Sequence, residues 1–281
     1  MNYRHSYHAG NFADVAKHSL LVLLLEALGK KPAPWHYFDT HAGAGAYDLA
    51  GEAALRTGEA QSGILRLWAA RGSLPPAAER LCAIVAGLNP GLAPGELPRY
   101  YPGSPWLAAA LARDMDCLTL AELHPEDAQS LKAEFRRDKR TAVHLRDGYE
   151  MLSALTPPPE RRGLVLMDPP YEVPDEFERL KKTLKSCYGR WPGGTYALWY
   201  PLKDEMVRTR FLREVERSGL RRILYAELRL SAQTDGLGGS GLLVVNPPWQ
   251  SEDAMRECLV ALAKVLAPET GSARVDWLVP E

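Results

Sequence analysis

The chain has 281 residues, of which 46% are hydrophobic, and its 34 basic and 35 acidic side chains leave a net charge of −1. This composition is typical of one large folded domain and excludes a disordered chain. The near-neutral balance excludes nucleic-acid binding by overall charge, so any such binding needs a local basic surface.

Nothing in the sequence indicates export or membrane insertion. The four cysteines are widely scattered without metal-ligand spacing, which favours reduced core thiols over a metal site or a disulfide framework. The first residues lack the pattern of a signal peptide. The longest apolar run, 20–25, is far shorter than the ~20 residues of a membrane span. We therefore expect a cytoplasmic protein that does not contact a membrane.

Short β-rich runs alternate with helical patterns along the chain. The first helix is expected over about 12–28, with Asn11 as its N-cap. Seven strands are expected, at 35–38, 117–120, 142–145, 164–167, 195–199, 223–230 and 242–245. Between the first six strands, helices are expected at about 105–113, 126–137, 148–154, 175–188 and 203–218. This rhythm predicts a doubly wound α/β sheet.

The last two expected strands are joined only by the glycine-rich segment 231–241. A parallel crossover needs about a dozen residues or more, usually with a helix, so these strands should pair antiparallel. Seven strands with a reversed last pair resemble the Rossmann-like fold of S-adenosylmethionine-dependent methyltransferases. This resemblance is an analogy between folds and does not by itself establish function.

One stretch, about 50–100, breaks the alternation. It contains two helical patterns, at roughly 61–70 and 76–87, and ends in a series of prolines and glycines. We expect a single methyltransferase domain over 1–281, with this stretch as a small helical subdomain inserted after the first strand and its glycine loop. The insertion should lie beside the active-site end of the sheet.

The strongest catalytic signal is Asp168-Pro169-Pro170-Tyr171, which directly follows the apolar run 163–167. A carboxylate at the end of a strand lies at the carboxyl edge of the sheet, where α/β proteins bind ligands, and the prolines make the turn rigid. An adenine N6 amine is a double donor, and the Asp168 carboxylate and the Pro169 carbonyl could accept from it. Tyr171 could stack on the extruded base. The alternative is a structural turn.

A glycine loop, Asp39-Thr40-His41-Ala42-Gly43-Ala44-Gly45, follows the first strand. Gly43 and Gly45 would let the backbone approach a ligand closely, although the loop could also be a structural turn. A dinucleotide fold places a third glycine at the next spacing, where this chain has Asp48. The loop therefore favours a ligand without a pyrophosphate over NAD.

Two more carboxylates follow the next strands. Glu122 ends the second strand, where an acid can accept both ribose hydroxyls of a nucleoside cofactor, and the insertion explains its distance from the glycine loop. Asp147, followed by Gly148, comes after the third strand and is placed to accept from the adenine amine of the cofactor. Each carboxylate could instead be a helix cap.

A second motif, Asn246-Pro247-Pro248-Trp249, resembles the variant used by amine methyltransferases. It follows the strand that we expect to be reversed, so it should lie away from the cofactor edge. The amino-terminal segment is polar, aromatic and rich in histidine, and Lys17 and His18 follow it. Composition alone is also consistent with a surface tail in the amino-terminal segment and with solvated side chains at Lys17 and His18.

Six motifs recur in the same order in a known family. They are Tyr3-Arg4-His5-Ser6-Tyr7-His8-Ala9-Gly10-Asn11, Asp39-Thr40-His41-Ala42-Gly43-Ala44-Gly45, Tyr100-Tyr101-Pro102-Gly103-Ser104-Pro105, Glu122-Leu123-His124-Pro125, Asp168-Pro169-Pro170-Tyr171 and Ala197-Leu198-Trp199-Tyr200-Pro201. The chain closely resembles the bacterial RlmJ family, whose members are adenine-N6 methyltransferases of large-subunit (23S) ribosomal RNA. The likeness covers the chain from about residue 1 to 281 and is weakest in the insertion.

The resemblance implies S-adenosyl-L-methionine as cofactor and a specific adenine of 23S ribosomal RNA, before full ribosome assembly, as substrate. It implies a catalytic role for Asp168 and makes Tyr3 and His5 part of the active-site surround. It also implies cofactor contacts from Lys17, His18, His41, Ser104, Glu122, Asp147 and Gly148.

Support for RNA from the sequence itself is only local. Basic clusters lie at 136–140, 161–162, 181–182, 208–213 and 221–222. Most such clusters are solvated faces, and we expect a subset to line the mouth of the cleft and bind phosphates, with a steep salt dependence.

Other functions stay open at this point. A DNA adenine methyltransferase would use the same pocket, whereas protein glutamine methylation prefers Asn at position 168. A non-catalytic RNA-binding module on the same fold would fail to bind the cofactor, and an NAD oxidoreductase would need the missing glycine. No heptad or apolar stripe argues against a monomer, so we expect one without an obligate protein partner.

Overall fold

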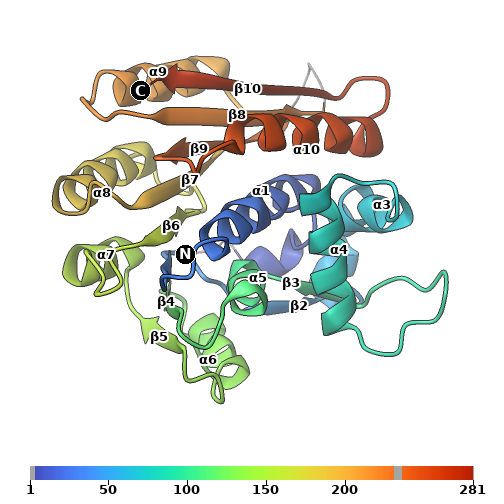
Figure 1. The fold of residues 1–281 in the computed structure, drawn as a ribbon. Coiled ribbons are helices and arrows are strands. Elements are labelled where there is room, and N and C mark those ends of the chain that lie inside the picture. Colours follow the sequence, from blue (N-terminus) through green and yellow to red (C-terminus); the bar gives the residue numbers. More distant parts are fainter. Residues whose placement is uncertain (1–3, 231–235, 281) are drawn as a thin grey trace.

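The computed structural model describes residues 4–230 and 236–280. An eight-stranded sheet in the order β10-β8-β9-β7-β6-β1-β4-β5 forms its centre (Figure 1). The strands are β1 (His36–Asp39), β4 (Cys117–Glu122), β5 (Thr141–Leu145), β6 (Gly163–Met167), β7 (Thr195–Pro201), β8 (Ile223–Arg229), β9 (Gly239–Val245) and β10 (Ser272–Val279). Because β5, β4, β1, β6 and β7 pair in parallel, their carboxyl ends share one edge.

Helices cover both faces of the sheet (Figure 1). One face packs against α1 (Phe12–Gly29), α4 (Pro76–Leu88), α5 (Ser104–Leu111) and α10 (Ser251–Leu266), and the other against α7 (Gly148–Leu155), α8 (Glu176–Arg190) and α9 (Glu205–Glu216). α6 (Pro125–Glu134) contacts β4 and β5. Leu164 and Leu166 of β6 face the first core and Val165 the second, so this strand is apolar throughout.

The fold class predicted from the sequence is confirmed, including the reversed strand. β9 pairs antiparallel with both β7 and β8. The expected sheet of seven strands was too small, because β10 adds an eighth strand antiparallel to β8, after a helix, α10, that was also not expected. β10 is an edge strand with mostly half-exposed side chains, so its apolar pattern is weak.

Helix α1 crosses the centre of this arrangement. The Asn11 side chain accepts a hydrogen bond from the Asp14 amide at 2.9 Å, which caps the helix as predicted. The helix packs on α4, α5, α10, β6 and β9 and is therefore buried on most sides. Lys17 and His18 lie on this buried helix, so the interpretation of them as solvated residues is wrong.

The helical insertion begins and ends in a small two-stranded sheet. β2 (Ala46–Asp48) and β3 (Tyr100–Pro102) pair antiparallel. Between them lie α2 (Glu52–Thr57), the 3₁₀ turn η2 (Glu59–Ser62), α3 (Ile64–Ala69) and α4. The helices expected at 61–70 and 76–87 correspond to α3 and α4. Buried side chains of the insertion belong to the same apolar core as those of α1.

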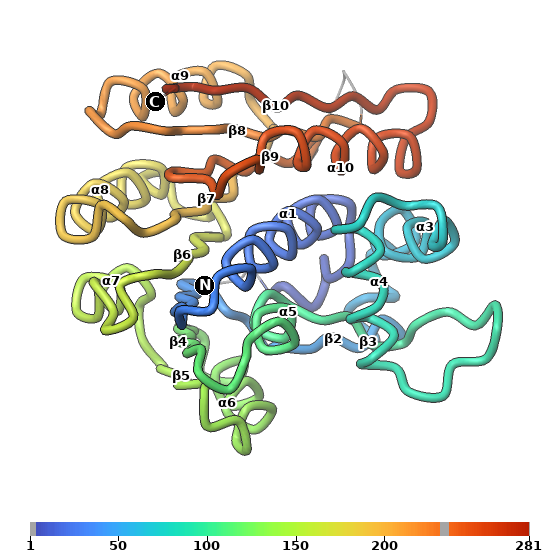
Figure 2. The backbone as a smooth tube through the Cα atoms, in the orientation of Figure 1, coloured from blue at the N-terminus to red at the C-terminus, as the bar shows by residue number. Residues whose placement is uncertain are grey.

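The amino-terminal segment contacts both the insertion and helix α6. It contains one 3₁₀ turn, η1 (His5–Tyr7), and in Figure 2 it lies near the centre of the molecule, where α1 begins. His8 and Asn11 bond to Glu59 of the insertion at 2.8 and 2.9 Å, and Arg4 bonds to Glu126 of α6 at 2.7 Å. No helix among the described residues is long and apolar enough to span a membrane.

Candidate active site

The sequence motifs meet at the carboxyl edge of the parallel strands. The glycine loop follows β1, Glu122 ends β4, Asp147 follows β5 and Asp168 follows β6. Because β1 pairs in parallel with β4 and β6, and β4 with β5, these groups converge although they are far apart in sequence. The edge therefore carries three carboxylates beside the glycine loop.

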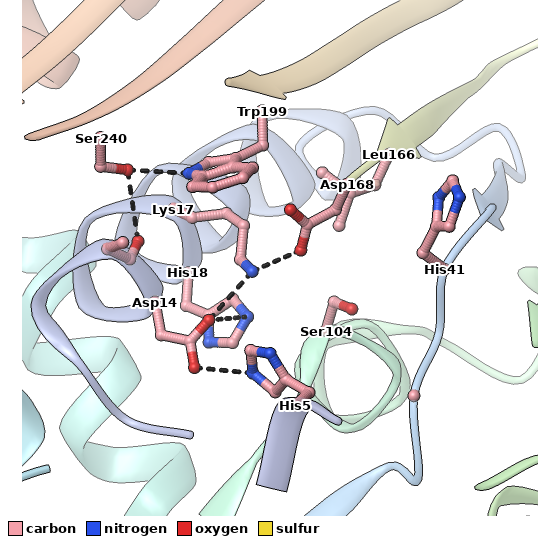
Figure 3. A network of polar contacts seen from close by, with 12 residues as sticks. His5, Asp14, Lys17, His18, His41, Ser104, Leu166, Asp168, Trp199 and Ser240 are labelled. Atoms are coloured by element: carbon pink, nitrogen blue, oxygen red, sulfur yellow. Dashed lines mark hydrogen bonds and ion pairs between the residues drawn. The ribbon is translucent and has the colours of Figure 1, made fainter. Parts of the chain in front are cut away.

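Asp168 is held by a side chain from helix α1 (Figure 3). The Lys17 ammonium donates to Asp168 Oδ2 and, at 2.9 Å, also to Asp14 Oδ1. Lys17 and Asp14 are both buried, whereas Asp168 is partly exposed. A buried ammonium between two carboxylates is a paired charge, and it fixes the position of Asp168 Oδ2.

The charges of this group depend on one another. Burial alone would raise the pKa of Asp14, but the nearby His5, Lys17 and His18 hold it well below its usual range. Burial alone would lower the pKa of Lys17, but Asp14 and Asp168 raise it above its usual value. Lys17 is therefore a permanent cation at neutral pH.

The amino-terminal segment joins this network through His5. Its Nε2 lies 2.8 Å from Asp14 Oδ2, an oxygen that also accepts from the Gly10 amide at 2.9 Å. The His5 ring also packs edge-on against Tyr47, with 5.0 Å between centroids. Tyr3, predicted to bind substrate, lies outside the described residues.

Tyr171 is fixed in a strained turn. Its φ of 53° is in the left-handed region, which a non-glycine residue adopts only when its surroundings enforce it. Its hydroxyl donates to the Trp199 carbonyl at 2.6 Å, and its ring lies 4.6 Å from that of Phe177, centroid to centroid. The Trp199 ring in turn lies beside Lys17, whose Nζ is 5.8 Å from the ring centroid.

Glu122 organises the glycine loop. Its two carboxylate oxygens accept from the backbone N–H groups of Gly43 at 2.8 Å and His124 at 2.7 Å. Gly43 has a φ of 64°, and a Cβ on it would lie 2.1 Å from the Tyr47 hydroxyl, so only glycine fits there. Burial raises the pKa of Glu122, although its backbone donors oppose this.

Asp147 is the N-cap of α7. Its Oδ1 accepts from the Tyr149 and Glu150 amides at 2.9 and 3.1 Å, and its Oδ2 accepts from Arg179 at 2.8 Å. A Cβ on Gly148 would lie 2.1 Å from the Thr40 carbonyl, so α7 begins in close contact with the glycine loop. Asp147 is therefore a helix cap, as the alternative interpretation held. Its carboxylate nevertheless lies at the carboxyl edge of the sheet.

Ser104 and His41 both bond to a buried carboxyl group under the glycine loop. The Ser104 hydroxyl donates to Asp39 Oδ2 at 2.6 Å, Tyr37 donates to the same oxygen at 2.8 Å, and the His41 amide donates to Oδ1 at 3.2 Å. Burial raises the pKa of Asp39 to about 6 and lowers that of His41 to about 4. The His41 imidazole, which is close enough to Asp168 to interact with its charge, is therefore neutral at pH 7.

His18 lies between Tyr101 of the insertion and Asp14, whose Oδ1 is 4.0 Å from His18 Nε2. Its Nδ1 lies 2.7 Å from the Tyr101 hydroxyl, and its ring stacks on that of Tyr101 at 5.5 Å. Burial, helped by Lys17 and His5 and opposed by Asp14, lowers its pKa to about 3. The predicted cofactor contact of His18 stays a prediction.

The depressed pKa of His18 makes stability depend on pH. Between pH 6.5 and about 3 the unfolded chain binds a proton that the folded chain does not, so this contribution is complete above pH 6.5 and declines as the pH falls. His18→Gln is expected to flatten the loss of unfolding free energy between pH 6.5 and 4.5, measured by urea titration. His144→Gln, on β5, is the control, and an unchanged slope in His18→Gln would contradict the assignment.

Asp14 and Trp199 are site residues whose roles the sequence did not reveal. The signal for Asp14 was its spacing: Asp14, Lys17 and His18 are i, i+3 and i+4, which places them on one face of the helix. Trp199 and Ser240 bond at 2.9 Å between Nε1 and Oγ, which joins β7 to β9 beside this face (Figure 3).

The second Pro-Pro motif lies at the opposite edge, as predicted. The Asn246 side chain donates to the carbonyls of Pro192 and Gly194, which precede β7. The basic clusters 136–140, 161–162 and 221–222 also precede strands, namely β5, β6 and β8. They therefore lie away from the candidate active site. Of the basic clusters named above, 181–182 and 208–213 remain candidates for the mouth of the cleft. Cys82, Cys187 and Cys258 are buried free thiols, as expected for core cysteines, whereas Cys117 is a half-buried free thiol.

The edge residues fit an S-adenosylmethionine molecule by donor and acceptor chemistry. Each Glu122 oxygen accepts one backbone hydrogen bond and has capacity for another, as two ribose hydroxyls require. The carboxylates of Glu122, Asp147 and Asp168 supply negative charge for a cationic sulfonium. The fold and the carboxylates along its edge define a Rossmann-like methyltransferase.

Comparisons with known proteins identify the family. A model of the family described as "Ribosomal RNA large subunit methyltransferase D, RlmJ" matches residues 32–279. The chain is 44% identical to Ribosomal RNA large subunit methyltransferase J of Escherichia coli and 43% identical to that of Haemophilus influenzae, in each case over the full length of both proteins. A Legionella pneumophila crystal structure matches with a TM-score of 0.89 and 34% identity, covering 96% of this chain and 98% of that one. The chain belongs to this family of ribosomal RNA large subunit methyltransferases.

Proposed function

We propose that the protein transfers a methyl group from S-adenosylmethionine to the N6 amine of a specific adenine in large-subunit (23S) ribosomal RNA. Membership of the family supports the RNA substrate. The observation that carries the adenine assignment is the Asp168-Pro169-Pro170-Tyr171 turn at the carboxyl edge, fixed by Lys17. Such a turn presents a rigid pair of oxygen acceptors, which is what an exocyclic amine requires.

Asp168 and Pro169 orient the amine in this mechanism. Lys17 occupies Asp168 Oδ2, and we assign Oδ1 and the Pro169 carbonyl to the two N–H groups of N6. Their negative charge is directed at the nitrogen as it becomes positive in the transition state. The cofactor supplies an electrophilic methyl group when bound. Formation of the N–C bond would break the S–CH₃ bond and leave the cofactor as a neutral thioether. The positively charged N6 then loses its proton to the Asp168 carboxylate or to water, so no strong base is needed beforehand.

The target base must leave its stack to reach this edge. We assign Tyr171 to one face of the extruded adenine, and Tyr3 and His5 to the opposite wall of the pocket. This arrangement is supported by two contacts that fix the Tyr171 ring, one with the Phe177 ring and one with the Trp199 carbonyl. A further support is the contact of His5 with Asp14, which shares the Lys17 ammonium with Asp168.

We assign the cofactor to the glycine loop and its neighbours. The ribose hydroxyls would bond to Glu122 and the adenine amine to Asp147, with Gly148 keeping α7 close. Gly43, Gly45 and His41 would line the loop, and Ser104 would support it through Asp39. Lys17 and His18 would complete the wall from α1.

Glu122→Ala is expected to weaken S-adenosylmethionine binding about tenfold to a hundredfold, because hydrogen bonds to a charged acceptor contribute ~1.5–3 kcal/mol. Isothermal titration calorimetry measures the dissociation constant. Glu269→Ala, an exposed acid far along the chain, is the control. An affinity within twofold of the unmodified protein would remove Glu122 from the cofactor site.

The remaining assignments concern the setting of the reaction. We propose a cytoplasmic monomer that acts on large-subunit RNA before assembly is complete and needs no protein partner. Methylation of free RNA but not of assembled large subunits would support this order.

The substrate class is tested by transfer of labelled methyl from S-adenosylmethionine. Protein-free large-subunit RNA, bulk DNA and a protein extract are offered in competition. Label in RNA alone is the expected result. Label in DNA or protein would keep the enzyme class and overturn the substrate.

A further inference from the structure

A basic groove lies at the edge of the sheet opposite the candidate active site. It encloses about 450 Å³, and its wall includes Lys30, Lys31, Arg162 and Trp249. Arg162 directly precedes β6, and Asp168 directly follows it. The groove and the catalytic carboxylate are therefore at opposite ends of one strand, and the backbones of Arg162 and Asp168 are ~20 Å apart for six steps at ~3.3 Å each.

The cations of this groove are not neutralised. Lys30 and Lys31 are exposed, and within the described ranges neither forms an ion pair. The Arg162 guanidinium donates to the carbonyls of Ala33 and Leu28, at 2.5 and 3.0 Å, and to no carboxylate among those residues. Three positive charges in one concave surface, two of them lysines without an ion pair in the described ranges, attract a polyanion, although the whole protein carries a charge of only −1.

Trp249 adds a flat aromatic surface to these charges. Its side chain is 84% exposed, which is unusual for so large an apolar group. The turn that carries it is rigid: Asn246 is bonded at 2.7 and 2.9 Å to the carbonyls of Pro192 and Gly194, and two prolines follow it. An indole held in water beside cations is the arrangement on which unpaired bases stack in single-stranded nucleic-acid sites.

We propose that this groove binds a single-stranded segment of the substrate RNA, with a base on Trp249 and phosphates on Lys30, Lys31 and Arg162. The proposal rests on the proposed function only in taking RNA as the substrate. The contact is separate from the pocket for the target adenine, so it contributes to RNA affinity and not to the chemical step. It also gives the second Pro-Pro motif a role.

Two variants test the groove, Trp249→Ala and the double variant Lys30→Ala/Lys31→Ala. Trp249→Ala is expected to bind protein-free large-subunit RNA about tenfold more weakly. The double variant should lower the slope of log affinity against log salt by ~1.4, because each phosphate contact on a single strand contributes ~0.7. In both, KM for RNA rises while kcat at saturating RNA and S-adenosylmethionine affinity stay unchanged.

Lys132→Ala/Lys264→Ala is the matched control, because it removes two exposed lysines, on α6 and α10, that lie outside the groove and outside every basic cluster named above. Trp249→Phe, which keeps an aromatic face, should recover most of the lost affinity. RNA affinities and salt slopes equal to the control in both groove variants would overturn the proposal while the unmodified protein still methylates RNA. If the unmodified protein transferred no methyl to RNA, the proposed function itself would fail.

Discussion

Asp168→Ala is expected to lower methyl transfer at least ~10²- to 10³-fold, while S-adenosylmethionine affinity stays within about twofold. The magnitude is that of removing one preorganised group that stabilises transition-state charge. The cofactor keeps its contacts because Glu122 and Asp147 follow other strands. Single-turnover kinetics with labelled cofactor measures the first effect, and calorimetry measures the second.

The control for this variant is Asp175→Ala. Asp175 is an exposed carboxylate seven residues further along the same segment, and its side chain makes no capping hydrogen bond to α8. It should leave both quantities unchanged. Asp168→Ala is expected to fold, because Lys17 keeps Asp14 as a partner. Thermal unfolding measures whether it does. Turnover like that of the unmodified protein would remove Asp168 from the mechanism.

Asp14→Asn is expected to have the second largest effect. It removes the charge that links His5 of the amino-terminal segment to Lys17, and through Lys17 to Asp168. Breaking a buried ion pair costs about 3–5 kcal/mol of unfolding free energy. Lys17 would also be less firmly placed, so kcat should fall about a hundredfold with little change in KM for S-adenosylmethionine, because a misplaced reacting group costs rate rather than cofactor binding.

A double-mutant cycle distinguishes this role from a general loss of stability. Asp14→Asn and His5→Gln should be non-additive in kcat, because the two residues act on Asp168 through one chain of contacts. Asp127→Asn, another acid in the first turn of a helix, is the control and should change kcat by less than twofold. Additive effects of Asp14 and His5 would mean that they stabilise the fold separately.

The positions of the edge residues could be predicted from sequence because of the geometry of parallel sheets. Gly43, Glu122, Asp147 and Asp168 each follow an apolar run, and parallel strands bring such residues to one edge whatever their separation along the chain. The reversed β9 followed from a connection too short for a crossover. The same argument placed Asn246 at the far edge, where its contacts with the turn before β7 now fix it.

The contacts between elements could not be predicted in this way. Lys17 and Asp168 are 151 residues apart, and no local pattern says that the side chain of a buried helix turns toward that strand end. The cost of burying Lys17 is offset by its i−3 neighbour Asp14 and by the tertiary contact with Asp168. β10 was missed for a related reason, since its position at the edge leaves it half exposed and its pattern weak.

The most direct measurement of the central claim is nucleoside analysis of large-subunit RNA after transfer of labelled methyl by the purified protein. Digestion and mass spectrometry identify the modified base and the atom that carries the methyl group. The account predicts N6-methyladenosine, absent when Asp168→Ala replaces the unmodified protein. Methyl groups on a ring carbon, on a ribose or on another base would contradict the roles assigned to Asp168 and Pro169.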